Sequence, residues 1–154
     1  MKFDYLPCPD ATTPKKDCDT FESCVAAVTC FEGKCNAATQ AKVAKFASCF
    51  EGFPGQTEGY CTEDNFSMAN ATRCSRDVAG LDYDSIVGCF HNKTAAAAAM
   101  TQLDGACNKQ GPAWFPYVVI NGKATGSDDK DMFPILPKLC AAYEKAGGAK
   151  PKEC

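Results

Sequence analysis

The sequence contains no Cys-x-x-Cys pair, although twelve of its 154 residues are cysteine. This absence excludes the usual redox dithiol and the usual zinc knuckle, because both depend on two cysteines separated by two residues. The abundance of cysteine is typical of a compartment where disulfides form and persist. We therefore interpret the cysteines as a disulfide framework, made of Cys8, Cys18, Cys24, Cys30, Cys35, Cys49, Cys61, Cys74, Cys89, Cys107, Cys140 and Cys154.

Long apolar runs and clustered positive charge are also missing. No apolar run approaches the roughly 20 residues that span a bilayer, so we expect no transmembrane segment. The net charge is −3 with acids and bases interspersed, and nothing resembles the basic stripe of a nucleic-acid surface. We expect no nucleic-acid partner and no cofactor.

The first residues lack the hydrophobic region of a signal peptide. Twelve free thiols would be a liability in the cytosol, so we interpret the numbering as starting inside a processed precursor. Three Asn-x-Ser/Thr sequons, at Asn65, Asn70 and Asn92, favour a secretory route and a glycoprotein. We expect a secreted, lysosomal or other oxidising lumenal location, and not the cytosol.

The length fits a single domain over residues 1–154, long enough to bury a core. Alternation predicts a short strand at 3–6, and the polar, cysteine-rich residues 10–34 indicate a stapled loop. Asn36 is expected to cap a helix over 37–50 that ends at Gly52. A second helix is expected over 65–76.

The second half of the sequence predicts a longer helix, followed by a strand, a hairpin and a final helix. Asp84 or Ser85 is expected to cap a helix that runs through an alanine-rich stretch and ends at Gly105. Residues 115–120 indicate a covered strand, and Asn121-Gly122 is a strong hairpin signal. A final helix is expected from Ser127 or Asp128 to Gly147-Gly148.

The segment Phe-Pro-Tyr-Val-Val-Ile-Asn-Gly-Lys at 115–123, followed by Cys140 and a terminal Cys154, resembles the end of the gamma-interferon-inducible lysosomal thiol reductase family. The segment from Cys18 to Cys30 is similar to the family's Cys-Gln-His-Gly-x-x-Glu-Cys signature and the cysteine beyond it. The Gln-His-Gly of that signature is absent here. Later family cysteines correspond to Cys49, Cys74 and Cys89.

The resemblance implies an α-rich α/β fold, an incomplete thioredoxin-like fold with a helical insertion, stapled by disulfides. It implies that this chain lacks the N-terminal strand–helix unit that carries the family's Cys-x-x-Cys. Pro116 would be the cis-proline of that fold, and Cys140 would pair with Cys154. Four cysteines are additional to the family pattern: Cys8, Cys35, Cys61 and Cys107.

Cys30 and Cys35 are the nearest approach to a redox pair. Lys34 and a helix beginning at Asn36 would both favour a thiolate there. The alternative is that the two cysteines belong to structural bridges with different partners. We favour the structural interpretation and keep Cys30 and Cys35 only as weak catalytic candidates.

The remaining candidates each have a simpler explanation. His91, the single histidine, is expected to be a solvated helix residue, not a zinc ligand or a nucleophile's base. The acidic cluster at 128–131 lacks the ligand pattern of a calcium loop and is expected to favour a helix N-terminus. Aromatic residues entering the 115–120 strand are expected in the core: Trp114, Phe115 and Tyr117.

Two functional hypotheses follow. The first is a non-catalytic, disulfide-rich binding or scaffold module, a subunit of a larger assembly whose protein partner covers the incomplete sheet and helix surface. The second is a thiol–disulfide oxidoreductase whose Cys-x-x-Cys lies in a missing or separate segment, or which uses Cys30 and Cys35. The absent dithiol favours the first, so we lean against an enzyme.

Overall fold

The computed structural model describes residues 16–31, 34–52, 66–110, 119–120 and 123–124, together with residues 140–142, 144, 145, 147 and 149. The chain divides into two compact units, residues 3–110 and residues 111–154 with residues 1–2. The described part of the first unit is helical. The described part of the second unit contains a two-stranded ladder and a short helical stretch.

The expected α/β thioredoxin-like fold is wrong, because the described residues form an all-α structure apart from one small ladder. Its strands are β1 (Val119–Ile120) and β2 (Lys123–Ala124), which pair antiparallel with Ile120 opposite Lys123. The hairpin prediction is confirmed by this pairing. In the described segments 16–31, 34–52 and 66–110, buried residues recur with a helical period of 3.6 and not with the period of 2 that a sheet requires.

The first helix, α1 (Lys16–Thr29), occupies a segment that was expected to be a loop. Its buried stripe is formed by Cys18, Phe21, Cys24 and Val25, at helical spacing. Buried cysteine packs as a small apolar residue, and two of the four positions in this stripe are cysteines. In the sequence these two cysteines suggested a disulfide-bonded loop and not the apolar face of a helix. Acidic residues in the first turn also favour the helix, because they interact well with its positive end.

The next helical segment follows the sequence expectation closely. Asn36 caps α2 (Ala37–Ala47), and its Oδ1 accepts a hydrogen bond from the Thr39 N–H at 2.8 Å. The helix continues as the π-helical segment η2 (Ser48–Gly52). Val43, Phe46 and Phe50, at helical spacing along this segment, are buried in the core.

Two further helical segments follow in the first unit, and the second of them packs against α2. Ser67 caps α3 (Met68–Thr72), which continues as the π-helical segment η3 (Arg73–Val78). The two segments form a continuous helical run over 68–78, which agrees with most of the helix expected over 65–76. Gly80, with φ of 65°, follows in the left-handed region that glycine adopts readily, and the chain then turns into the next helix.

The long helix expected up to Gly105 is two helices. Asp82, not Asp84 or Ser85, caps α4 (Tyr83–His91), and α5 (Lys93–Gln110) continues past Gly105. They are separated at Asn92, whose backbone is extended and whose side chain accepts hydrogen bonds from the first amides of α5. The sequence expectation missed this internal cap.

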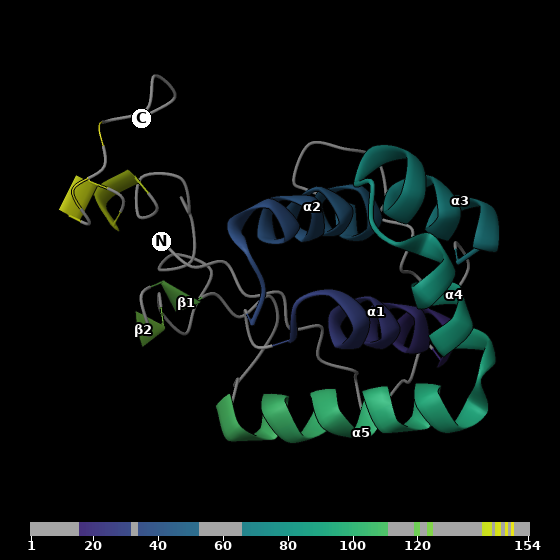
Figure 1. The fold of residues 1–154 in the computed structure, drawn as a ribbon. Helices are drawn as coiled ribbons and strands as arrows, with labels where there is room; N and C mark the ends of the chain where they lie inside the picture. The colour runs from purple at the N-terminus through teal and green to yellow at the C-terminus, as the bar shows by residue number, and fades with distance from the viewer. Residues whose placement is uncertain are drawn as a thin grey trace. The chain divides into compact units, whose positions relative to one another are not determined.

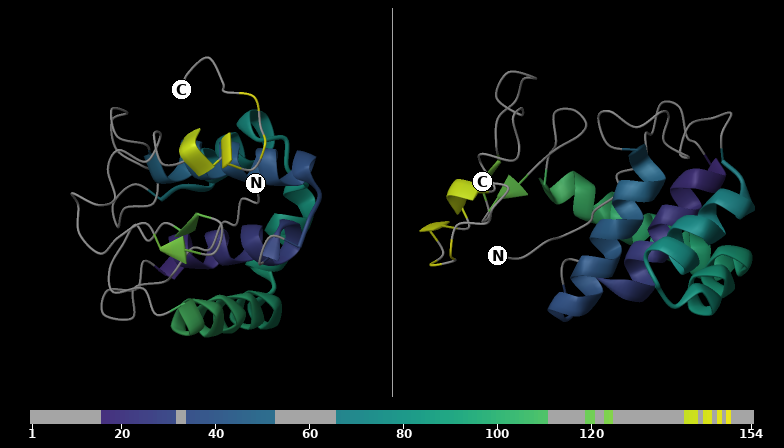
Figure 2. Two further views of the ribbon diagram at one scale, coloured as in Figure 1. Left: turned by 90° about the vertical axis from the view of Figure 1, so that its left-hand side faces the viewer. Right: turned by 90° about the horizontal axis from the view of Figure 1, so that it is seen from above.

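Helix α1 lies between α2 and α5, as Figure 1 and the left-hand view of Figure 2 show. The face of α5 toward α1 is rich in small residues, which allow the two helices to approach closely. Phe21 of α1 is fully buried at the centre of an aromatic cluster. Its ring centroid lies 5.6 to 6.3 Å from those of Phe46, Phe50, Phe66 and Phe90.

Candidate functional site

Disulfides connect the helices of the first unit. Cys24 of α1 pairs with Cys89 of α4, and Cys49 of η2 pairs with Cys74 of η3. Cys24 and Cys74 are fully buried, so both bridges are part of the core. All nine cysteines among the described residues are disulfide-bonded, which adds Cys18, Cys107 and Cys140 to the three bridges whose partners are described.

The third bridge joins Cys30 to Cys35, two residues that were expected to have different partners. That expectation is wrong because the chain reverses between α1 and α2 and brings the two Cα atoms to 5.1 Å. The Cys30 N–H donates to the Ala26 carbonyl, and the Gln40 side-chain amide donates to the Cys35 carbonyl. Backbone and side-chain hydrogen bonds therefore hold both ends of the turn.

The two sulfurs of this bridge have different surroundings. Cys30 is 1% exposed and follows the last residue of α1, at the negative end of that helix. Cys35 is half-buried and lies beside the exposed Lys34, directly before the cap of α2. An external thiolate reaches the half-buried sulfur of Cys35 more easily than that of Cys30.

This asymmetry works against thiol–disulfide exchange. Attack on Cys35 would expel the thiolate of Cys30 into a buried site at the negative end of α1, where an anion is unfavourable. Attack on Cys30 would release a better-placed thiolate at Cys35, but its target is buried. The geometry therefore fits a structural bridge better than a catalytic one.

His91 does not complete a nucleophile or a metal site in the described residues. It is exposed at the end of α4, and its ring lies against Phe90 with the centroids 5.2 Å apart. Cys89, two residues before it, is already in a disulfide. Within the described ranges, no group of three or more His, Cys, Asp or Glu side chains is placed to hold a metal ion.

Buried polar residues on α1 were missed by the sequence reasoning. Asp19 and Glu22 are buried, and Ser23 is fully buried. The Ser23 hydroxyl contacts the Asp19 carbonyl at 2.6 Å and the Met100 sulfur of α5 at 2.9 Å. Their spacing at i, i+3 and i+4 was a signal for a shared helix face, but it became readable only once residues 16–29 were known to be helical.

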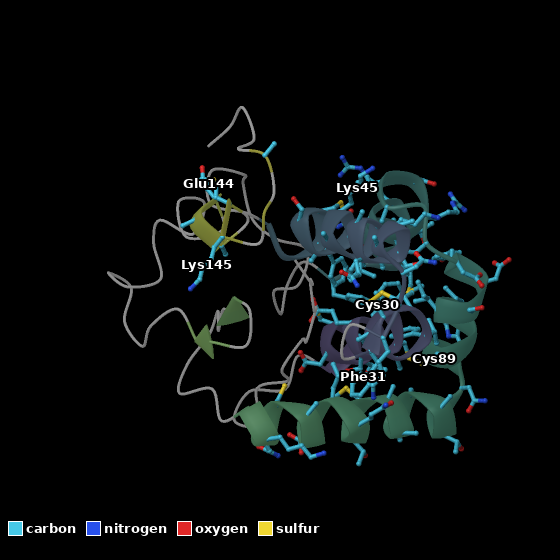
Figure 3. The ribbon with its side chains drawn as sticks, turned by 60° about the vertical axis from the view of Figure 1, so that its left-hand side comes forward. Cys30, Phe31, Lys45, Cys89, Glu144 and Lys145 are labelled. Atoms are coloured by element: carbon cyan, nitrogen blue, oxygen red, sulfur yellow. A yellow bond between two sulfur atoms is a disulfide. The ribbon has the colours of Figure 1, made fainter. Side chains whose placement is uncertain are left out.

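Exposed cations gather on two neighbouring segments. Lys42 and Lys45 are exposed on α2, and Arg73 and Arg76 are exposed on η3, which packs against α2. Figure 3 shows Lys45 on the side of α2 away from α1. Asp77 lies 2.8 Å from the Arg76 guanidinium and raises its pKa above the ordinary value, chiefly through that hydrogen bond. We call Lys42, Lys45, Arg73 and Arg76 the basic surface.

Several expected site residues lie outside the described residues. They are Pro116, Trp114, Phe115, Tyr117, Asn65, the acidic cluster at 128–131 and the cysteines at 8, 61 and 154. The expected Cys140–Cys154 pairing remains a prediction for the same reason. Of the other two sequons, Asn70 is half-buried in α3 and Asn92 is exposed between α4 and α5.

In comparisons with protein-family models, with curated proteins and with solved structures, the chain shows no match. Among the helices in the described part of the chain, none combines the length and apolar character needed to cross a bilayer.

Proposed function

We propose that this chain is a non-catalytic, disulfide-stapled helical module that binds or scaffolds a protein partner in an oxidising compartment, either outside the cell or in a lumen such as the lysosome. One observation carries the proposal: every cysteine among the described residues is oxidised, and most of them are buried in the core. Buried disulfides stabilise a fold, whereas disulfide-exchange chemistry needs an accessible thiolate.

The alternative is a thiol–disulfide oxidoreductase, as the resemblance to the thiol reductase family suggests. It takes two forms, one with the active dithiol on another segment and one with Cys30 and Cys35 as the exchanging pair. Cys35 beside Lys34 favours the second form, because a cation and a helix N-terminus both favour a thiolate. The burial of Cys30 opposes it.

The basic surface supports a partner with an acidic face. Four exposed cations on α2 and η3 stand against one acidic residue, Asp77, among the described residues of these two segments. The whole chain is nevertheless acidic, with a net charge of −3. Such separation of charge orients a protein toward a partner of complementary charge and raises the association rate.

Thiol counting tests the absence of exchange chemistry. The full chain is secreted from eukaryotic cells, alkylated without reductant and after stepwise addition of dithiothreitol, and measured as an intact mass. We expect twelve oxidised cysteines and no bridge that opens while the fold is native. Selective opening of Cys30–Cys35 at the lowest reductant concentrations would replace this proposal with the oxidoreductase. Free thiols throughout the secreted chain would contradict the disulfide-stapled module itself.

Charge reversal tests the binding surface. Lys42→Glu with Lys45→Glu changes the basic surface, and Lys93→Glu with Lys109→Glu makes the same change in net charge on α5. We expect the first pair to abolish salt-sensitive binding of a labelled poly-glutamate peptide and the second pair to retain most of it. Equal losses would show that only net charge matters and would refute a specific surface.

A further inference from the structure

Two of the three Asn-x-Ser/Thr sequons lie in the described residues, and the structure places them in different surroundings. Asn92, Lys93 and Thr94 are all exposed, at the junction of α4 and α5. Asn70 is half-buried inside α3, and the residue after it, Ala71, is fully buried. A glycosylation sequon must be at the surface, because the attached sugar is bulky and hydrated.

The two polar atoms of the Asn92 side chain, Oδ1 and Nδ2, can have separate roles. Oδ1 accepts hydrogen bonds from the Thr94 and Ala95 N–H groups, each at 3.1 Å, and so caps α5. The glycan of a glycoprotein is carried by the other atom, Nδ2. Substitution at Nδ2 leaves the carbonyl oxygen in place, so a glycan and the helix cap are compatible at the same residue.

The second sequon lacks these properties. The Thr72 hydroxyl, which belongs to the Asn70 sequon, lies 2.6 Å from the Met68 carbonyl and 2.6 Å from the Tyr83 hydroxyl. The second of these contacts joins α3 to the start of α4. A glycan on the half-buried Asn70 would compete for space with that packing, whereas all three residues of the Asn92 sequon are exposed.

We infer that Asn92 is an N-glycosylation site of this protein and that Asn70 is not. In the reaction, Asn92 Nδ2 forms a bond to the anomeric carbon of a lipid-diphosphate-linked oligosaccharide. The bond between that carbon and the diphosphate oxygen breaks, the lipid diphosphate leaves with the bonding electrons, and Nδ2 loses one proton. The donor and its transferase are those of the secretory pathway.

The position of Asn92 leaves the α2 part of the basic surface, Lys42 and Lys45, uncovered. α5 packs along α1, and α2 lies on the other side of α1. A glycan at the α4–α5 junction therefore shields His91 and Lys93 and stays away from α2. Glycosylation at this position and a partner bound at Lys42 and Lys45 can coexist.

The inference rests on the oxidising-lumen part of the proposed function. The experiment secretes the full chain from eukaryotic cells and digests it with a glycosidase that converts glycan-bearing asparagine to aspartate in heavy-oxygen water. Peptide mass spectrometry then locates each label. Thr94→Ala removes the sequon but keeps the Asn92 cap, Thr94→Ser keeps both, and Asn70→Gln is the matched control.

We expect label at Asn92 in the parent, Thr94→Ser and Asn70→Gln chains, loss of that label in Thr94→Ala, and no label at Asn70. Secreted, fully oxidised protein without label at Asn92 would overturn the inference and leave the proposed function standing. Label at Asn70 would overturn its second half. Free thiols in the same secreted sample would count against the proposed function instead, so the two failures are distinguishable.

Discussion

Helix α1 is linked by disulfides to two different helices, and the two links differ in reach. Cys24–Cys89 joins α1 to α4 across 65 residues, and both cysteines are buried. Cys30–Cys35 joins the end of α1 to the start of α2 across only five residues, and Cys35 is half-buried. Each linked helix begins with a side-chain cap, Asp82 on α4 and Asn36 on α2.

The difference in sequence separation suggests different roles: the long bridge determines the fold, and the short bridge stabilises a turn. A cross-link between distant residues removes more freedom from the unfolded chain than a cross-link between near neighbours. The long bridge therefore fixes which helices pack together. The short bridge fixes a reversal that its own hydrogen bonds already favour.

The largest loss of stability is expected from removing the long bridge, Cys24–Cys89. Replacing Cys24 and Cys89 by alanine should lower the free energy of unfolding by about 4 kcal/mol, the loop-closure value for 65 residues. Chemical denaturation followed by circular dichroism measures this change. A loss below about 1 kcal/mol would mean that α1 and α4 are held together by their packing alone.

A smaller effect is expected from the short bridge. Replacing Cys30 and Cys35 by alanine should cost about 2 kcal/mol, because the closed loop has only five residues. The same denaturation experiment gives a direct comparison with the first pair. If the short bridge proved the more stabilising, the loop-closure explanation of the comparison would be wrong.

The two regions were also unequally predictable from the sequence. α2 was predicted because Asn36 is a strong cap and Val43, Phe46 and Phe50 are conspicuous apolar residues at helical spacing. α1 was missed because two cysteines occupy its apolar stripe, and cysteine is counted with the staples of loops. The break at Asn92 was missed because an asparagine inside a helical pattern was interpreted only as a sequon.

Disulfide partners and fold class needed three-dimensional information. Cys30 and Cys35 are close because the chain reverses, and that reversal depends on where α1 ends. The α/β expectation came from residues 115–123 and from the family resemblance, whereas strand pairing in the described residues extends over only two residue pairs. Local patterns identified the Asn36 cap of α2 but misplaced the cap of α4 and missed the one at Asn92. Long-range pairing was beyond them.

The next largest loss of stability is expected from removing the Asn36 cap of α2. Asn36→Ala removes the acceptor for the Thr39 N–H and should cost about 1 kcal/mol. Asn36→Asp is the matched control, because it keeps a capping oxygen and adds a negative charge at the positive end of α2. Thermal unfolding of both variants should show a lower midpoint for alanine only. Equal midpoints would show that the short bridge makes the cap redundant.

The smallest expected effect on stability comes from the Asp82 cap of α4, and it depends on pH. The pKa of Asp82 lies below its ordinary value, first because the Ser85 hydroxyl donates to its carboxylate at 2.7 Å and then because the Ser85 N–H does so at 3.3 Å. A carboxylate with a lowered folded-state pKa stabilises the fold above its unfolded pKa of about 3.9. That contribution is lost as the pH falls through the folded-state pKa. Carboxyl titration by NMR should therefore show a pKa for Asp82 below the ordinary aspartate value, and Ser85→Ala should raise that pKa.

Asp82→Asn supplies the control for this acid dependence, because it keeps the capping oxygen and removes the titrating group. Its stability should fall less between pH 5 and pH 2 than that of the parent chain. Asn36, the corresponding cap on α2, does not titrate, so of these two caps only the one on α4 should be sensitive to acid. Amide exchange at low pH should then show the first turn of α4 opening before that of α2. The reverse order would show that the link to α1, and not the charge of the cap, sets the local stability of these helix ends.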